Sequence, residues 1–234
     1  WQGLSPLELH QARRGHTATL LHNGSLLLVG GEPLEGSSLE ESFPYLLDGW
    51  ETTASLAVGR TGTTATALPD GKILVAGGSD GAVLGSAEVY DPELDQWSQA
   101  ATLPAPRAFH EAAELADGRV ILVGGRSQAG QVVVETALFQ QGATPAWSAG
   151  PSLAPGRVFH TLTHLLDDSV LVVGGEDAAG LPTATVRLVV LEGEQVVVRE
   201  VSPLPSPRSR HSATLLYNGR VVVQQRRRMA GAGA

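Results

Sequence analysis

One pattern recurs along the chain and restricts the folds that are open to it. An arginine followed three residues later by histidine or threonine returns about every 50 residues, with the arginines spaced 47, 47, 50 and 51 residues apart. These arginines are Arg13, Arg60, Arg107, Arg157 and Arg208. Repetition at a fixed period of this length is typical of solenoids and propellers, in which each unit buries its apolar surface against the next.

Three further features keep the same spacing. A turn pair such as Asn-Gly stands seven residues after each histidine or threonine position. A glycine pair begins fourteen residues after that position in the first four copies, and Gln224-Gln225 takes its place in the fifth. Tryptophan precedes three of the arginines by ten residues, at Trp50, Trp97 and Trp147. Agreement at four separate offsets excludes chance as the explanation.

Each unit has the pattern of four strands. Residues 16–22 and 25–31 flank an Asn-Gly pair, which favours the positive φ angles of a two-residue hairpin turn. Short apolar runs follow the turns (LLLV, ILVA, VILV, VLVV and RVVV), as expected for strands buried on both faces. Residues 86–93 and 96–104 supply a third and a fourth strand in the second unit. The sequence therefore predicts an all-β fold, a β-propeller whose blades are antiparallel four-stranded sheets.

The pattern resembles the kelch repeat, in the bacterial form that reads HTATLL-DG-VLVVGG. The resemblance rests on the glycine pairs, on Tyr90 and Trp97, and on the Arg-x-x-His sequence that begins each unit. It implies a single kelch propeller over residues 1–225 and a C-terminal tail at 226–234. The repeat units are placed at about 13–59, 60–106, 107–156, 157–207, and 208–225 plus 1–12. Function stays open, because one propeller fold hosts many activities.

The last unit breaks the pattern after Val223, since no third strand and no tryptophan follow. The sequence predicts five blades, of which the last is irregular or incomplete and is closed by the N-terminal segment. A closed ring predicts a monomer. The alternative is a piece of a larger propeller with six or seven blades, whose unpaired edges would tend to associate.

The candidate site lies in loops that resembling propellers place around one mouth of the axis. These loops are the connection before each first strand and the segment after each glycine pair. Residues outside the repeat pattern are the better candidates, because the fold does not demand them in every blade. The predicted ligand-binding residues are Arg14, Glu32, Asp80, Phe109, Arg126, Phe159, Glu176 and Arg210. Arginine forks at such a mouth would suit carboxylates, sulfates or sugar hydroxyls.

The repeat arginines and histidines are interpreted as structural residues that tie neighbouring blades together. The alternatives are a pocket of arginines and a metal held by imidazoles near the axis. The glycine pairs are not expected to cradle a phosphate, because loop-like segments rather than helices follow them. No catalytic residue, cofactor or metal is predicted.

Composition narrows the range of partners. The net charge of −8 argues against nucleic acid, and no apolar run approaches the ~20 residues that cross a bilayer. The chain has no cysteine, so it lacks the tyrosine–cysteine crosslink of the copper-radical sugar oxidase that has similar repeats. The sequence predicts a non-catalytic module that binds a protein, peptide or carbohydrate, with a secreted or cell-surface location as the expectation. The alternatives are a sugar-modifying enzyme of the epimerase or isomerase type and a fragment of a larger kelch protein.

Overall fold

The computed structural model describes residues 12–33, 36–39, 42–46, 49–50 and 53–225, and these residues form only strands, turns and loops. The first sheet contains β1 (Thr17–Leu20), β2 (Leu26–Val29), β3 (Ser42–Leu46) and β4 (Gly49–Trp50). The second contains β5 (Thr64–Ala67), β6 (Ile73–Ala76), β9 (Ala87–Asp91) and β10 (Gln96–Gln99). The third contains β11 (Glu111–Glu114), β12 (Val120–Val123), β13 (Glu135–Gln140) and β14 (Ala146–Ser152). The fourth contains β15 (Thr161–His164), β16 (Val170–Val173), β17 (Val186–Glu192) and β18 (Gln195–Val201).

Two smaller sheets complete the described part. β19 (His211–Leu215) pairs with β20 (Val221–Gln225), and β7 (Ser79–Asp80) pairs with β8 (Ala82–Val83) in a short hairpin after the second glycine pair. No helix in the described ranges is long and apolar enough to cross a membrane.

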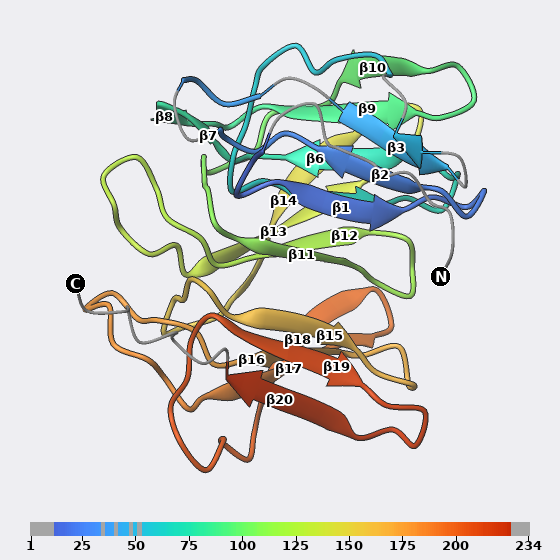
Figure 1. The fold of residues 1–234 in the computed structure, drawn as a ribbon. Helices are drawn as coiled ribbons and strands as arrows, with labels where there is room; N and C mark the ends of the chain where they lie inside the picture. Colours follow the sequence, from blue (N-terminus) through green and yellow to red (C-terminus); the bar gives the residue numbers. More distant parts are fainter. Residues whose placement is uncertain (1–11, 34–35, 40–41, 47–48, 51–52, 226–234) are drawn as a thin grey trace, which may run out of the picture.

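The first strands of successive sheets lie side by side in the order β1, β5, β11, β15 and β19 (Figure 1). Within each four-stranded sheet the chain runs antiparallel from the first strand to the last. This arrangement confirms the predicted all-β propeller, with four complete blades and the first two strands of a fifth. The predicted closure by the N-terminal segment concerns residues 1–12, and residues 1–11 lie outside the described part.

The turn inside each first hairpin differs from the predicted two-residue type. Leu21 N–H donates to Ser25 O at 2.8 Å, and Gly24 N–H donates to Leu21 O at 3.0 Å, so three residues form the loop. Of these three, only Gly24 has a positive φ, at 85°. A type I turn followed by one left-handed residue needs glycine only at its last position. The Asn-Gly signal therefore predicted a hairpin correctly and its loop length wrongly.

The second strands form the core of the blades. β6 and β12 are buried at every position, and β2 and β16 at three of four. β20 is the exception to the prediction that every apolar run is buried on both faces, because Val222 is 38% exposed. Among the described residues β20 has β19 as its only partner strand, so nothing in that part of the chain covers its outer side.

The glycine pairs stand where neighbouring blades meet. A Cβ on Gly30 would lie 2.3 Å from the carbonyl oxygen of Arg60, and Gly30 has a φ of 64°. Both facts exclude an ordinary side chain there, so β2 ends at Val29. In the fifth copy β20 continues to Gln225, which pairs with His211. This register places Gln225, not Gln224, at the position of the first glycine, in agreement with the fourteen-residue offset counted from His211.

The repeat arginines were predicted to tie neighbouring blades together, and they do so through their backbone, whereas their side chains bond within one blade. The backbone carbonyl of Arg60 accepts a hydrogen bond from Gly31 of the preceding blade at 2.9 Å. Its fully buried side chain instead donates to Gly77 O at 2.9 Å and Ser86 O at 3.2 Å, next to the second and third strands of its own blade. Arg107 and Arg157 are also fully buried. Their guanidinium groups therefore belong to the scaffold and are not available to a ligand.

Two tryptophans connect the outer strands of the second and third blades to the segment that follows the preceding blade. Trp97 Nε1 donates to Ala54 O at 2.7 Å, and Trp147 Nε1 donates to Ala101 O at 2.8 Å. The ring of Trp147 packs on Phe139, with centroids 5.0 Å apart. Apolar clusters fill the spaces between blades in the same way, so the core runs from blade to blade around the axis.

Candidate functional site

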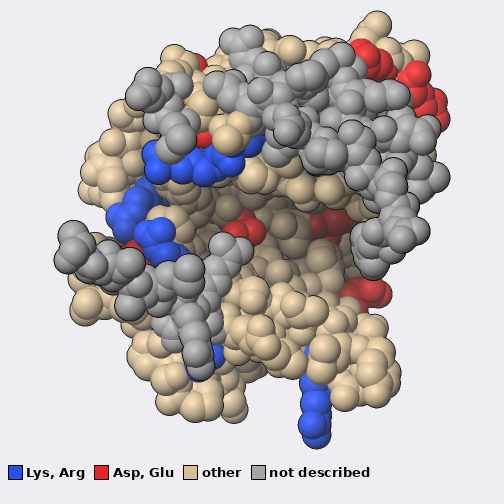
Figure 2. All heavy atoms as spheres, in the orientation of Figure 1, with Lys and Arg blue, Asp and Glu red and all other residues tan. Residues whose placement is uncertain are grey.

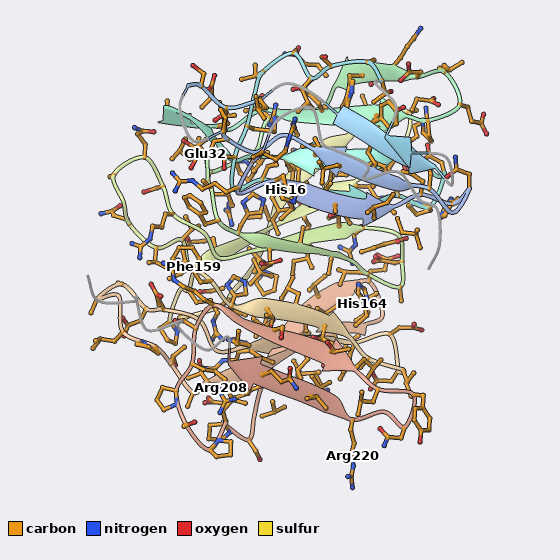
Figure 3. The ribbon with its side chains drawn as sticks, in the orientation of Figure 1. His16, Glu32, Phe159, His164, Arg208 and Arg220 are labelled. Carbon is orange, nitrogen blue, oxygen red and sulfur yellow. The ribbon has the colours of Figure 1, made fainter. Side chains whose placement is uncertain are left out.

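The predicted site residues lie at one end of the propeller. Figure 3 places Glu32 and Phe159 at this end, and His164 and Arg220 at the opposite end. The polypeptide enters every first strand here and turns back at the far end, so the connections before β1, β5, β11, β15 and β19 surround one mouth. In Figure 2 basic side chains gather at this end, beside a hollow in the surface.

One position of the repeat lines the mouth in all five units. It is the second residue after the repeat arginine, and its backbone is left-handed at Gly15, Gly62, Phe109, Phe159 and Arg210, with φ of 67°, 62°, 58°, 54° and 52°. Backbone hydrogen bonds link Gly62 N–H to Gly15 O at 3.0 Å, Phe109 N–H to Gly62 O at 2.8 Å, and Arg210 N–H to Phe159 O at 2.9 Å. These five residues, which we call the mouth column, thus form two hydrogen-bonded runs, Gly15–Gly62–Phe109 and Phe159–Arg210, and the ring contact between Phe109 and Phe159 joins them.

The side chains of the mouth column stack on one another. The Phe109 ring lies against Gly62, where an added Cβ would be 2.7 Å from it. The rings of Phe109 and Phe159 have centroids 5.8 Å apart at 49°, and Arg210 Cζ lies 3.7 Å from the Phe159 centroid. Phe109 remains 41% exposed. The stack therefore presents an open aromatic surface that ends in a guanidinium group.

Ion pairs connect the mouth column to the loops after the glycine pairs. Arg210 Nε donates to Glu176 Oε1 at 3.2 Å, and Ser209 Oγ lies 3.0 Å from the same oxygen. Arg14 Nε donates to Glu32 Oε1 at 2.8 Å. The arginine side chains are 75% exposed at Arg14 and 63% at Arg210, so these pairs orient loops more than they stabilise the fold.

The two remaining candidates stand on separate loops. Arg126 forms a backbone bridge with Ala108, and its Nη1 donates to Gly130 O at 3.0 Å. Asp80 is exposed in the β7–β8 hairpin. The structure thus brings Phe109, Phe159, Glu176 and Arg210 into one cluster and pairs Arg14 with Glu32, while Arg126 and Asp80 join neither group. The site assignments themselves remain predictions.

Three of the predicted site residues, Phe109, Phe159 and Arg210, belong to the mouth column, although the sequence prediction does not place them at one repeat position. The alignment contained the signal, because the second residue after each arginine reads Gly, Gly, Phe, Phe, Arg. Two glycines in such a column indicate a left-handed backbone, and the three larger residues must adopt the same conformation.

Each repeat histidine follows a residue of the mouth column, and His110, His160 and His211 are buried, whereas His16 is exposed. His110 Nε2 lies 3.0 Å from Thr64 Oγ1, and His211 Nε2 lies 3.1 Å from Thr161 Oγ1, each across a blade boundary. Both contacts support the structural interpretation of the repeat histidines. Burial lowers the pKa of His110 to about 3, and Arg107 acts in the same direction. The described residues contain no group of three or more histidine or acidic side chains that could hold a metal ion.

Comparison with known proteins agrees with this architecture. The kelch motif model matches residues 60–104. The solved structure of YjhT has a TM-score of 0.72 with this chain at 16% sequence identity, over 91% of this chain and 80% of that one, so the likeness is one of fold. No curated protein matches the sequence. The motif, the shared fold and the recurring four-stranded sheets together support a β-propeller of the kelch-repeat type.

Proposed function

We propose that this propeller is a non-catalytic binding module that captures a protein or peptide segment at its axial mouth. One observation carries the proposal: Phe109, Phe159 and Arg210 keep a left-handed backbone where the first two units use glycine. Such a conformation costs roughly 1–2 kcal/mol for an ordinary residue. Strained residues of this kind persist where the surrounding structure holds them, and they cluster at active sites and ligand-binding positions.

The chemistry of the stack suits a macromolecular partner. Aromatic and arginine side chains contribute most of the binding energy at protein interfaces. Phe109 offers an exposed ring to an apolar side chain. Arg210 engages Glu176 through Nε, and its two Nη groups make no hydrogen bond within the described residues. A peptide with an apolar anchor next to a carboxylate would satisfy both groups.

The exposed side chain of Arg14 adds a second cation at the same mouth. Rim charges of this kind steer an oppositely charged partner toward the surface and influence the rate of association more than the final affinity. The proposal therefore favours acidic segments and predicts that salt slows their binding.

Selection from a random peptide library on the wild-type protein tests this function. The counter-selection uses Phe109→Gly combined with Arg210→Gly, because glycine already occupies this repeat position at Gly15 and Gly62. We expect peptides that carry an aromatic or aliphatic residue close to Asp or Glu and that bind the variant at least about tenfold more weakly. Peptides that bind both proteins equally, or no selection at all, would refute the assignment. A carbohydrate array is probed with the same two proteins. A glycan that binds the wild type but not the variant would replace the peptide as the proposed ligand.

A further inference from the structure

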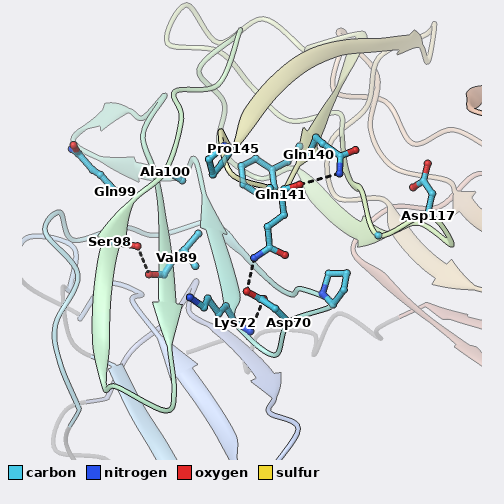
Figure 4. Close-up of a pocket in the computed structure, with 14 residues that line it drawn as sticks. Asp70, Lys72, Val89, Ser98, Gln99, Ala100, Asp117, Gln140, Gln141 and Pro145 are labelled. Atoms are coloured by element: carbon cyan, nitrogen blue, oxygen red, sulfur yellow. Dashed lines mark hydrogen bonds between the residues drawn. The ribbon is translucent and has the colours of Figure 1, made fainter.

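We propose that the cleft between the second and third blades is a second binding site, for a small neutral polyhydroxylated ligand of mono- or disaccharide size. The cleft has a volume of about 580 Å³ (Figure 4). Binding pockets for small molecules commonly measure about 300 to 1,000 Å³. The cleft is therefore large enough for one or two sugar rings.

This cleft lies far from the mouth. Its inner wall is formed by the hairpin turns that follow β5 and β11, at the ends of these strands opposite to Gly62 and Phe109. Its outer wall comes from β10 and from the turn between β13 and β14. No residue of the mouth column contributes to the lining, so the inference does not depend on the proposed peptide-binding function.

A difference between equivalent residues explains why this cleft is open. Arg119 follows the Asp-Gly turn of the third blade, and its Nη2 reaches the carbonyl oxygen of Glu194 in the fourth blade at 2.8 Å. Lys72 has the same place in the second blade, but its Nζ pairs with Asp91 of its own blade at 3.0 Å. The boundary between the third and fourth blades thus has a cationic bridge that the boundary between the second and third lacks.

Among the described residues that line the open cleft, one side-chain hydrogen bond joins its two walls. Gln141 Nε2, from the third blade, donates to Asp70 Oδ2 of the second at 2.8 Å (Figure 4). Asp70 Oδ1 accepts the backbone N–H of Lys72 at 3.2 Å. Because this bond is exposed to solvent, a ligand hydroxyl can replace it at little cost.

The lining is suited to hydroxyl groups. Gln99, Gln140 and Gln141 contribute amides, each of which both donates and accepts hydrogen bonds, and Ser98 adds a hydroxyl. Sugar hydroxyls also donate and accept, so these groups match them without a change of protonation. The partly buried Val89 and Ala100 and the exposed Pro145 provide apolar surface among these polar groups. A sugar ring has the same combination of a polar edge and apolar C–H faces.

The charges of the cleft favour a neutral ligand. Lys72 is occupied by Asp91, and their hydrogen bond raises the pKa of Lys72 and lowers that of Asp91. Asp117 is paired with Arg119 at 2.6 Å. Asp70 forms no ion pair with any other residue that the structure describes, and its carboxylate disfavours anions. An anionic sugar acid would therefore bind more weakly than its neutral parent.

Saturation-transfer NMR on the complete chain tests this site, with glucose, galactose, mannose, maltose and cellobiose as probes and glucuronate as the charged comparison. We expect at least one neutral sugar to bind and glucuronate to bind more weakly. Gln140→Ala and Gln99→Ala should each weaken the bound sugar by about tenfold, the effect of one lost hydrogen-bonding group. Gln195→Ala, which changes an exposed glutamine at the start of β18, should leave binding unchanged.

The Phe109→Gly variant separates this site from the mouth, because it should bind the sugar as the wild type does. Sugar binding lost in Phe109→Gly but kept in Gln140→Ala would move the site to the mouth and overturn the proposal. Binding of none of the probes, or equal binding of glucose and glucuronate, would also overturn it.

Discussion

Arg60 Nη2 lies 2.5 Å from Glu88 Oε1, and both side chains are shielded from solvent, at 0% and 3% exposure. Burial lowers the pKa of Arg60, and the charge and hydrogen bond of Glu88 oppose that shift. Glu88 Oε2 also accepts the backbone N–H of Ala57 at 2.8 Å. This carboxylate therefore fixes the loop that enters the second blade as well as the arginine that joins two of its strands.

Replacing Glu88 should destabilise the protein strongly. Glu88→Gln leaves the charge of Arg60 buried without a counterion, which costs about 3–5 kcal/mol of unfolding free energy in comparable sites. Urea denaturation followed by tryptophan fluorescence measures this loss. Glu135→Gln is the matched control, since Glu135 stands at the same repeat position, is exposed, and holds Arg107 through its backbone carbonyl. Equal losses in the two variants would contradict the role assigned to the buried pair.

Acid should weaken the fold through its buried imidazoles. Burial lowers the pKa of His160 to about 3, and neither ring nitrogen has a hydrogen-bond partner among the described residues. An imidazole whose pKa falls on folding stays neutral in the native state, so stability is lost as the pH drops from about 6.5 toward 3. The loss approaches ~1.4 kcal/mol per pH unit for each such group.

The His160→Gln variant isolates this contribution. Its unfolding free energy should fall less steeply than that of the wild type between pH 6.5 and 4.5, by up to ~1.4 kcal/mol per pH unit. His164→Gln, at an exposed position of β15, should keep the wild-type slope. A His160→Gln protein with the full acid sensitivity of the wild type would place the titrating group elsewhere.

Glu111 should give the opposite dependence of stability on pH. It begins β11, at the repeat position of Thr64 and Thr161, and burial raises its pKa to about 7. A carboxyl whose pKa rises on folding stabilises the native state below its unfolded pKa, and this contribution disappears as the pH rises from about 4.5 through 7. Glu111→Gln should therefore gain stability relative to the wild type over this range, by up to about 3 kcal/mol. Glu114→Gln, on the same strand, is the control, and a gain that does not change with pH would exclude titration of Glu111 as the cause.

The repeat predicted the propeller because each of its offsets has one structural cause. The glycine pair marks the close approach of Gly30 to the Arg60 carbonyl, and the tryptophan marks a bond such as that from Trp97 to Ala54. These contacts recur in successive blades, so a period search detects them without any homologue. The eight predicted site residues rest on the opposite criterion. The fold does not require them in every blade, so a role in binding is the alternative explanation for them.

The left-handed mouth column and the open cleft could not be predicted from single residue types. Phe109 and Arg210 give no sign of a left-handed backbone when considered singly, and only their alignment with Gly15 and Gly62 indicates it. The cleft is open because Lys72 pairs with Asp91 of its own blade. The residue type of Lys72 and its position in the repeat do not predict this partner. Backbone conformations and ion-pair partners of this kind depend on packing between blades, so they require the three-dimensional structure.

Removing the strained ring of Phe109 should cost little stability. Phe109→Gly relieves a left-handed residue, worth about 1–2 kcal/mol, and loses one aromatic contact with Phe159, worth about 0.5–1.5 kcal/mol. We expect the unfolding free energy to change by less than about 1 kcal/mol. Phe139→Gly, which removes a fully buried ring and adds flexibility to β13, should cost at least about 3 kcal/mol. A large loss in Phe109→Gly would make the mouth column a structural element and not a binding surface.

Closure of the ring can be tested through the outer edge of the fifth blade. β19 and β20 form a two-stranded sheet in the described residues, and the sequence predicts that the N-terminal segment completes this blade. The full chain should then be a monomer in light scattering and should melt in one cooperative transition. Deletion of residues 1–11 should leave the backbone edge of β20 open to other chains, so this variant should form dimers or larger species. An oligomeric full chain, or a deletion variant that remains monomeric with an unchanged melting temperature, would show that the N-terminal segment does not close the propeller.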